Sequence, residues 1–410
     1  MTQRAADPED RHSRVETLSD APPVRLGCGA LHELGIIAQD LGMHRAVIVC
    51  DPHFLHSNVV QTAGVRLREH GIASIVSSHV TPTPRYADVT AVLDVMQSGR
   101  PCDGVVSIGG GSTIDVGKAA SLLGKHGGTI AAYAHGEKVV DDAFPHIAVP
   151  TTAGTGAESS GYAFLLEDHG HEHTILHHDI LRPTAVIIDP LTHVSMPPRL
   201  TATTGLNALC DAIEAYVSRG HTPESDSLAL QAMHLIAGAL ETAYKHPEDL
   251  DARQAMARAS YIAGVAFEQA GLGIVDSIGL VLSEMFNIGQ SAANAILLPH
   301  VMAYDAFSVG DRMADVAQAL GHTADTPDQK SAAEAAIEAV TELKRRVGLT
   351  ENLGDRGMTW DDLYLCASQI LHHPFIKRNP RPLDEAGLTD ILLGSMETQH
   401  IIVGDPPTAA

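Results

Sequence analysis

The sequence predicts two domains of different class, an α/β domain followed by an all-α domain. Up to about residue 190, short β-branched runs alternate with helical patterns. This alternation is typical of a mostly parallel sheet with right-handed crossovers. After Asp189-Pro190 the β-branched runs end, and apolar residues recur at helical spacing instead. The 410 residues also exceed the size at which one core stops growing, about 250–300 residues.

The strands of the first domain are expected at apolar runs that end in a turn or a loop. They are residues 45–52 (RAVIVCDP), 71–80 (GIASIVSSHV), 103–112 (DGVVSIGGGS), 146–156 (HIAVPTTAGTG) and 184–190 (TAVIIDP). Helices of the second domain are expected at 204–218, 225–245, 252–271 and 331–348. Residues 167–179 are rich in histidine, a composition compatible with metal binding, although we favour an exposed hairpin between two strands.

These patterns predict an order of domains along the chain. We expect a mobile tail at residues 1–22, an α/β domain at 23–194, a helical domain at 195–403 and a second mobile tail at 404–410. The polar N-terminal segment has no apolar stretch of the kind found in signal peptides. No run of about 18 apolar residues predicts a membrane span.

Charge and cysteine usage narrow the class of protein. The net charge of −23 would repel the phosphates of a nucleic acid, so we expect no nucleic-acid partner. Because no membrane span is predicted either, we expect no membrane partner, and a small-molecule substrate instead. The five cysteines are widely spaced, odd in number and without a CxxC pair, so they predict neither a disulfide framework nor a zinc ribbon. A reducing, cytoplasmic location is the simplest interpretation.

A glycine-rich loop follows the run at 103–109. Gly109, Gly110, Gly111 and Ser112 separate this strand from a helix. Glycines let a backbone approach a pyrophosphate, and the start of a helix offers unpaired N–H groups. The spacing differs from GxGxxG, and a purely structural turn is the alternative. Lys118 is a further candidate for the phosphates unless it only lies along the helix surface.

Two other segments point to a dinucleotide. Asp51 ends a strand where a carboxylate can accept hydrogen bonds from an adenosine ribose, which favours NAD over NADP; capping a helix before Pro52 is the alternative. The loop PTTAGTG at 150–156 offers Thr151, Thr152 and Thr155 to the same ligand. NAD(H) is therefore the expected cofactor.

Five motifs together identify a family. GGGS, PTTAGTGAE, DAIEAYVS, NAILLPHV and NPRP follow one another over residues 23–400, and the chain resembles the iron-containing (group III) alcohol dehydrogenase family. The resemblance implies a dehydroquinate synthase-like fold, with an α/β dinucleotide domain, an all-α domain and an active site in the cleft between them. It also implies a homodimer or a larger homo-oligomer. His173 stands about where the family often has a lysine that contacts the cofactor.

The same resemblance implies a metal site that is altered here. Its four ligand positions, normally Asp, His, His and His, correspond to Asn207, Asp211, Asp276 and Gln290. A further family histidine near the substrate corresponds to Leu280. Imidazole gives such sites their affinity for iron and zinc, so neither metal is expected. Maleylacetate reductases are similar in having Asn at the first position, but they keep the histidines.

Three states of this pocket stay open at this point. In the first, which we favour, the pocket is metal-free and Asp211 or Asp276 donates a proton, because apolar surroundings raise the pKa of a carboxyl group. In the second, Mg²⁺ or Mn²⁺ binds to the carboxylates and amides. In the third, the pocket is inert. His300, Glu158 and Glu214 are expected to have structural roles.

The leading hypothesis is an NAD(H)-binding, metal-independent oxidoreductase that transfers hydride to or from a small carbonyl or alcohol compound. Asn207, Asp211, Asp276 and Gln290 would form its catalytic pocket. A redox-neutral lyase, cyclase or isomerase that uses Asp211 and Asp276 as acid and base is the first alternative. A non-catalytic nucleotide-binding homologue is the second.

Overall fold

The computed structural model describes residues 15–20, 22–168, 173–286, 288–324, 326, 328–397, 401 and 403. The chain divides into two compact units. The first comprises Met1–Met196 and Pro247–Arg258, and the second comprises Pro197–His246 and Ala259–Ala410. Of the two expected tails, residues 1–14, 21 and 404–410 lie outside the described residues.

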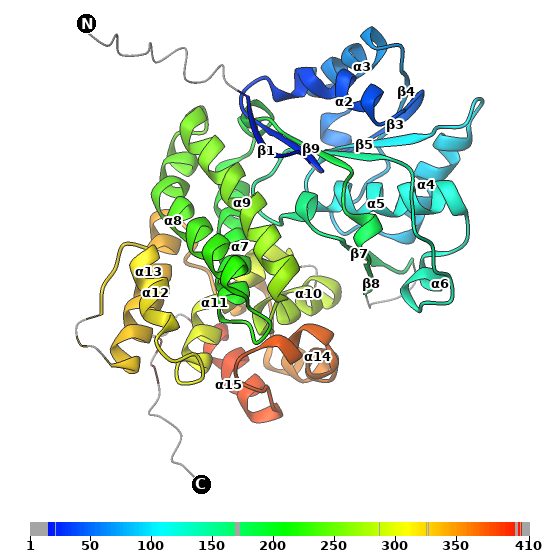
Figure 1. The fold of residues 1–410 in the computed structure, drawn as a ribbon. Helices are drawn as coiled ribbons and strands as arrows, with labels where there is room; N and C mark the ends of the chain where they lie inside the picture. Colours follow the sequence, from blue (N-terminus) through cyan, green and yellow to red (C-terminus); the bar gives the residue numbers. More distant parts are fainter. Residues whose placement is uncertain are drawn as a thin grey trace, which may run out of the picture. The chain divides into compact units, whose positions relative to one another are not determined.

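A seven-stranded sheet forms the centre of the first unit (Figure 1). Its spatial order is β1-β2-β9-β6-β5-β3-β4, and every neighbouring pair is parallel except β1 and β2. The strands are β1 (Glu16–Asp20), β2 (Pro23–Leu26), β3 (Arg45–Cys50), β4 (Ala73–Ser77), β5 (Gly104–Gly109), β6 (His146–Pro150) and β9 (Ala185–Ile188). All five expected runs therefore form strands, and the parallel α/β class is confirmed.

Helices cover both faces of this sheet because its strands are apolar on both sides. α2 (Leu34–Asp40) and α3 (Asn58–Glu69) pack on one face, over side chains such as Ile48 and Ile108. α4 (Tyr86–Gln97) and α5 (Gly111–His126) pack on the other, over Val47 and Val105. Short helical segments complete the unit: η1 (Ala30–Glu33), η2 (Pro52–Phe54), α6 (Ile130–Ala134), η3 (Ala157–Ser159), η4 (Asp179–Leu181) and η5 (Pro190–His193).

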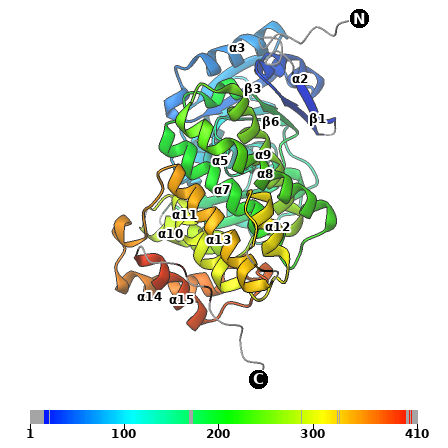
Figure 2. The same cartoon turned by 90° about the vertical axis from the view of Figure 1, so that its left-hand side faces the viewer.

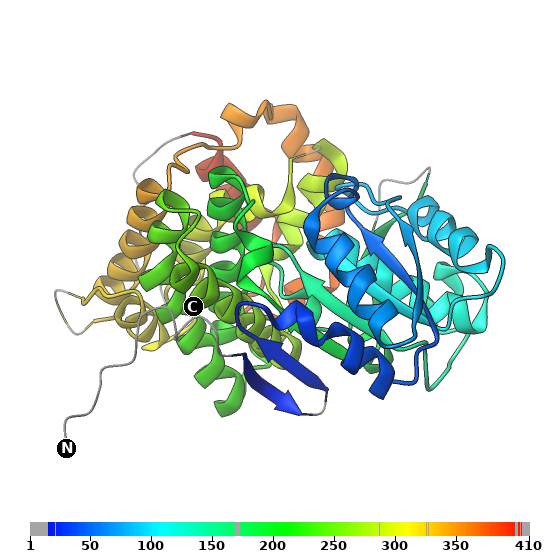
Figure 3. The ribbon, with the colours of Figure 1, turned by 90° about the horizontal axis from the view of Figure 1, so that it is seen from above.

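Two local features of this unit refine the sequence expectations. Part of the segment expected as a tail is a strand, since β1 pairs antiparallel with β2 at the edge of the sheet (Figure 3). The histidine-rich segment belongs to a hairpin, as favoured above: β7 (Tyr162–Leu166) pairs antiparallel with β8 (His173–His177). Residues 169–172 of that segment lie outside the described residues.

The second unit is helical in all its described elements, as the apolar spacing predicts. α7 (Pro198–Val217) and α8 (Pro223–Lys245) lie side by side over much of their length (Figure 2). The other helices are α9 (Leu250–Ala270, whose first turns belong to the first unit), α10 (Ile274–Phe286), α11 (Gln290–Asp305), α12 (Arg312–Ala319), α13 (Gln329–Arg346), η6 (Gly354–Arg356), α14 (Trp360–His372), η7 (Pro374–Arg378) and α15 (Glu385–Met396).

Among the described residues, no single helix is long and apolar enough to cross a bilayer. α9 and α10 reach the required length and composition only when taken together, and they are bent by 106° at their junction.

Candidate active site and nucleotide-binding edge

The first unit has a topological switch point between β3 and β5. The chain proceeds from β3 outward to β4, and then returns to place β5 on the other side of β3. In open α/β sheets, ligands bind outside the carboxyl ends of the strands at such a point. Asp51 follows β3 and the GGGS loop follows β5, and the register Cys50↔Ile108 places both at this edge. The predicted nucleotide residues therefore share one location.

The three glycines of this loop are needed because threonine side chains crowd them. A Cβ on Gly109 would lie 2.2 Å from Oγ1 of Thr113, and one on Gly111 would lie 2.7 Å from Oγ1 of Thr155. A Cβ on Gly110 would lie 3.1 Å from Oγ1 of Thr152. The glycine loop and the PTTAGTG loop are thus in direct contact, which the sequence could not show.

The first turn of α5 is open for an anion. Gly110 is its N-cap and supplies no side-chain hydrogen bond, so the helix begins with N–H groups that no cap satisfies. Ser112 donates its hydroxyl hydrogen bond to the carbonyl of Pro82. Thr151 is buried and donates its N–H to the carbonyl of Gly109 over 2.9 Å, whereas Thr152 and Thr155 are partly exposed.

Asp51 and Lys118 each make a contact within the protein. Asp51 accepts a hydrogen bond from the N–H of His53 over 2.7 Å, so it caps η2, the alternative role that the sequence left open. The hypothesis that Lys118 binds a phosphate is wrong, because its side chain is fully buried. Its ammonium donates a hydrogen bond to the carbonyl of Tyr162 and lies near Asp115 and Ser160. It faces inward because one α5 face packs on β7. His173 begins β8, outside the main sheet.

The second unit brings together the four residues assigned to the altered metal site. Asn207 and Asp211 lie one turn apart on α7, and Nδ2 of Asn207 donates to Oδ2 of Asp211 over 3.1 Å. Asp276 is in the first turn of α10, and Gln290 is the first residue of α11. Nε2 of Gln290 donates to Oδ1 of Asp276 over 2.7 Å.

Asn294 joins these two pairs, and the sequence analysis did not single it out. Its Nδ2 donates to Oδ1 of Asn207 over 2.9 Å and to Oδ1 of Asp276 over 3.1 Å. It is fully buried, and a Cβ on Gly279 would lie 1.8 Å from its Oδ1. The spacing of Asn294 could have identified it from the sequence, since it lies one helical turn after Gln290. We call these five residues, Asn207, Asp211, Asp276, Gln290 and Asn294, the amide–carboxylate cluster.

The start of α10, which carries Asp276, is fixed by two capping side chains. Glu214 accepts hydrogen bonds from the N–H groups of Gly273 over 3.0 Å and of Val275 over 2.6 Å. Oδ1 of Asn379, from the NPRP motif, accepts from the N–H of Ile274 over 3.4 Å. The structural role expected for Glu214 is therefore confirmed as capping. When ionised, this side chain also interacts favourably with the positive end of the helix dipole.

Burial and like charges change the acidity of this region. The pKa of Asp211 lies well above its usual range because burial disfavours the charged form, and the charges of Asp276 and Glu214 raise it further. The pKa of Glu214 is raised to about 8, again mainly by burial and then by Asp276. Three neighbouring buried carboxyl groups cannot all ionise at neutral pH without a large cost. The cluster is therefore able to hold a proton.

The donor atoms of the cluster are amides and carboxylates. Among the described residues, no group of three or more His, Cys, Asp or Glu side chains is arranged to hold a metal ion. The amide NH₂ groups of Asn207, Gln290 and Asn294 point at carboxylate or amide oxygens. An ion between these residues would need amide oxygens in those places. Leu280 is buried in α10.

Comparison with known proteins gives matches in both units. The family model described as iron-containing alcohol dehydrogenase matches residues 21–190. The model described as Fe-containing alcohol dehydrogenase family, C-terminal, matches residues 201–396. Together they cover most of the described chain.

Individual relatives match over nearly their whole length. NAD-dependent methanol dehydrogenase of Bacillus methanolicus is 34% identical, with 92% of this chain and 98% of that protein covered. The 1,3-propanediol dehydrogenase of Citrobacter freundii is also 34% identical, with 89% and 95% covered.

Solved structures are similar in fold. A crystal structure of 1,3-propanediol oxidoreductase has a TM-score of 0.88 at 32% identity, covering 93% of this chain and 100% of that one. Sulfoacetaldehyde reductase of Bifidobacterium kashiwanohense, in complex with NAD⁺, has a TM-score of 0.82 at 28% identity, covering 92% and 97%.

Proposed function

Since the chain belongs to the iron-containing alcohol dehydrogenase family and is an alcohol dehydrogenase- or reductase-like enzyme, we propose that it uses NAD(H) without iron or zinc. Its reaction is hydride transfer between the nicotinamide and a small alcohol or carbonyl compound. We place the protein in the cytoplasm as a homo-oligomer. The observation that carries the proposal is the amide–carboxylate cluster, in which Asp276 accepts hydrogen bonds from Gln290 and Asn294.

NAD(H) is supported by the chemistry of the switch point. The start of α5 offers N–H groups to a pyrophosphate, and the glycines Gly109, Gly110 and Gly111 let the backbone approach it. Asp51 would accept hydrogen bonds from the adenosine ribose and repel a 2′-phosphate. Two relatives fit this choice, because one is named NAD-dependent and another was solved with NAD⁺.

Iron or zinc fits the cluster poorly. Both metals are held tightly by imidazole or thiolate ligands, and the cluster offers neither. A harder ion such as Mg²⁺ or Mn²⁺ would need oxygens from Asn207 and Gln290, whose NH₂ groups instead face Asp211 and Asp276. We therefore assign the charge stabilisation of the reaction to a carboxylic acid and to amide N–H groups.

The two carboxylates of the cluster take different roles. Asp276 accepts from two amide NH₂ groups on one oxygen, which favours its charged form. Burial and, after it, that charge raise the pKa of Asp211 and keep a proton on it. Oδ2 of Asp211 accepts from Asn207, and no further hydrogen bond to Asp211 is present among the described residues. Oδ1 is therefore free to carry the proton to a substrate.

In this arrangement Asp211 donates a proton to the carbonyl oxygen of the substrate during reduction. When bound, NADH supplies the hydride that adds to the carbonyl carbon. In the oxidation direction, the same carboxylate takes the proton from the alcohol. A positioned acid of this kind contributes about 10²–10⁴-fold to a rate. Asn207 and Gln290 orient the two carboxylates.

The test is turnover by metal-stripped protein. Purified protein is dialysed against a strong chelator and assayed by NADH absorbance with a panel of small aldehydes and ketones, and by NAD⁺ reduction with the matching alcohols. We expect undiminished turnover on at least one pair. Activity that appears only after Fe²⁺, Zn²⁺, Mg²⁺ or Mn²⁺ is returned would refute metal independence. Absence of activity under all these conditions would refute the oxidoreductase assignment.

A further inference from the structure

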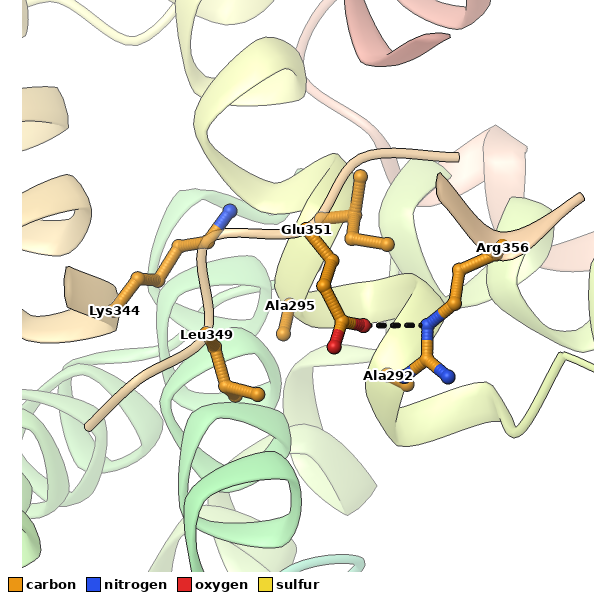
Figure 4. Close-up of a pocket in the computed structure, with 7 residues that line it drawn as sticks. Ala292, Ala295, Lys344, Leu349, Glu351 and Arg356 are labelled. Carbon is orange, nitrogen blue, oxygen red and sulfur yellow. Dashed lines mark ion pairs between the residues drawn. The ribbon is translucent and has the colours of Figure 1, made fainter. Parts of the chain in front are cut away.

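A hollow in the helical unit is too small for a ligand. It lies beside Ala292 and Ala295 of α11, where Glu351 pairs with Nε of Arg356 over 2.7 Å (Figure 4). It has room for about one water molecule. A buried polar side chain next to a ligand site is found instead in the first unit, beside the loop that we assign to the cofactor.

This side chain is His193, in η5. It is 1% exposed, and its Nε2 lies 3.0 Å from the carbonyl oxygen of Pro150, the residue before Thr151. Its Nδ1 is buried and has no hydrogen-bond partner among the described residues. Burying a polar ring in this way is costly, so its one hydrogen bond calls for a reason.

The hydrogen bond fixes the tautomer of the ring. Burial lowers the pKa of His193 to about 4, and the charge of Arg253 acts in the same direction, so the ring is neutral at neutral pH. A neutral imidazole carries a single N–H. Because a carbonyl oxygen only accepts, this hydrogen is on Nε2. His193 is therefore a fixed donor to Pro150.

Pro150 needs this donor because β6 extends beyond its neighbour β9. The last pair between the two strands is Ala148↔Val186. The N–H of Thr151 donates to the carbonyl of Gly109 in β5. In a planar trans peptide the carbonyl points away from the following N–H, so the carbonyl of Pro150 points to the β9 side. No strand pairs with it there.

The helical turn η5 supplies the missing donors. Its N-cap, Asp189, fixes the turn by accepting from the N–H of Leu191 over 3.1 Å. The hydroxyl of Thr192 lies 3.0 Å from the carbonyl of Pro150, but also 2.8 Å from the carbonyl of Asp189. One hydroxyl hydrogen is divided between two acceptors, so His193 is the main donor to Pro150.

Pro150 in turn sets the start of the PTTAGTG loop, which lies against the glycine turn. A Cβ on Gly110 would lie 3.1 Å from Oγ1 of Thr152, and one on Gly111 would lie 2.7 Å from Oγ1 of Thr155. The loop therefore borders the helix start that offers N–H groups to a pyrophosphate. A loop that is held in place beforehand does not have to be ordered when the ligand binds.

We propose that His193 is a positioning residue for the dinucleotide: as a neutral donor from Nε2 it holds Pro150, and through it the PTTAGTG loop, in the conformation that binds NAD(H). This inference rests on the NAD(H) site proposed above. It assigns a role in cofactor binding to a residue that does not touch the cofactor.

Fluorescence titration of the full chain with NADH tests this role. We expect the unmodified chain to bind NADH, and His193→Leu, which has no donor, to bind it at least fivefold more weakly. His193→Gln keeps an N–H at about the distance of Nε2 along the side chain, so it should restore most of the affinity. Thr192→Val should lose less affinity than His193→Leu, because Thr192 shares its hydrogen with Asp189.

His146 provides the matched control. It is 2% exposed and begins β6, at the opposite end from Pro150, where its Nε2 lies 2.8 Å from Oγ of Ser107. His146→Leu should lower the unfolding temperature, as His193→Leu does, but leave NADH affinity unchanged. The two variants thus separate a loss of stability from a loss of positioning.

Unchanged NADH affinity in His193→Leu would overturn the proposal. Equal weakening in His146→Leu would also overturn it, because a general loss of stability would then explain the effect. If the unmodified chain binds no NADH, the proposed cofactor is refuted, and this inference with it. If His193→Leu fails to fold by circular dichroism, His193→Asn takes its place, since its amide is too short to reach Pro150; affinity equal to that of His193→Gln would then refute the role.

Discussion

Gln290 donates a hydrogen bond from Nε2 to Oδ1 of Asp276 over 2.7 Å, linking the first residue of α11 to the first turn of α10. In the proposed mechanism, this amide stabilises a negative charge on Asp276, at a position where the family resemblance implies a metal ligand. Burial, and after it the charge of Asp276, raises the pKa of Asp211. In the proposed mechanism, Asp276 is the charged carboxylate of the cluster and Asp211 is the protonated one.

The proton donor is tested by removing each carboxyl group. Asp211→Asn should lower turnover by about 10²-fold or more, the scale for losing a positioned acid, while NAD(H) affinity stays nearly unchanged. Steady-state kinetics and calorimetry on the active substrate measure both quantities. Asp361→Asn, on the exposed start of α14, is the control and should behave like the unmodified enzyme. Full activity in Asp211→Asn would refute the assignment of Asp211 as the proton donor.

Asp276→Asn should change the pH profile. Without the charge of Asp276, the pKa of Asp211 falls, so the protonated form of Asp211 is lost at lower pH. We expect the alkaline limb of the carbonyl-reduction profile to move to lower pH. The measurement is kcat against pH for both proteins. An unmoved limb would show that Asp276 does not act through Asp211.

The metal content of the purified protein should be low. Because the cluster offers no imidazole or thiolate, we expect less than stoichiometric iron and zinc. Mass-spectrometric elemental analysis of protein purified without chelator is the measurement. About one Fe or Zn per chain that resists dialysis would contradict the expectation.

Cofactor preference tests the switch point. NAD(H) should bind more tightly than NADP(H), and Asp51→Ala should reduce this difference in affinity. Asp51→Asn separates two effects, because it removes the charge but keeps an oxygen that can cap η2 through His53. The surface variant Asp40→Ala is the control. Calorimetry that finds equal binding of NADP(H) by the unmodified chain would refute the role of Asp51.

Asp305 gives a prediction about stability. Burial raises the pKa of Asp305 to about 7, and the hydrogen bond from Asn379 offsets only part of this increase. A carboxyl group with a raised folded-state pKa stabilises the fold fully below its unfolded-state pKa, about 3.9, and loses that contribution as pH rises toward 7. Asp305→Asn should therefore flatten the dependence of the unfolding temperature on pH between 4 and 7. The control Asp390→Asn, at an exposed position, should leave this pH dependence unchanged.

The order of secondary structure was determined by the sequence. The runs at 45–52, 103–112 and 184–190 became β3, β5 and β9 because β-branched runs that end in Asp-Pro or glycine are local signals. The helical spacing after residue 197 likewise gave helices. Candidate residues could also be named from the chain, since Asn207 and Asp211 share a helix face by spacing alone.

Only the tertiary structure decided which side chains meet. Asn294 donates to Asn207 across 87 positions of the chain, and no local pattern encodes that contact. Lys118 looked like a phosphate ligand on a helix, yet the packing of β7 buries it. Local propensity depends on neighbours a few residues apart, whereas the partners, burial and pKa of a side chain depend on the elements that fold against it.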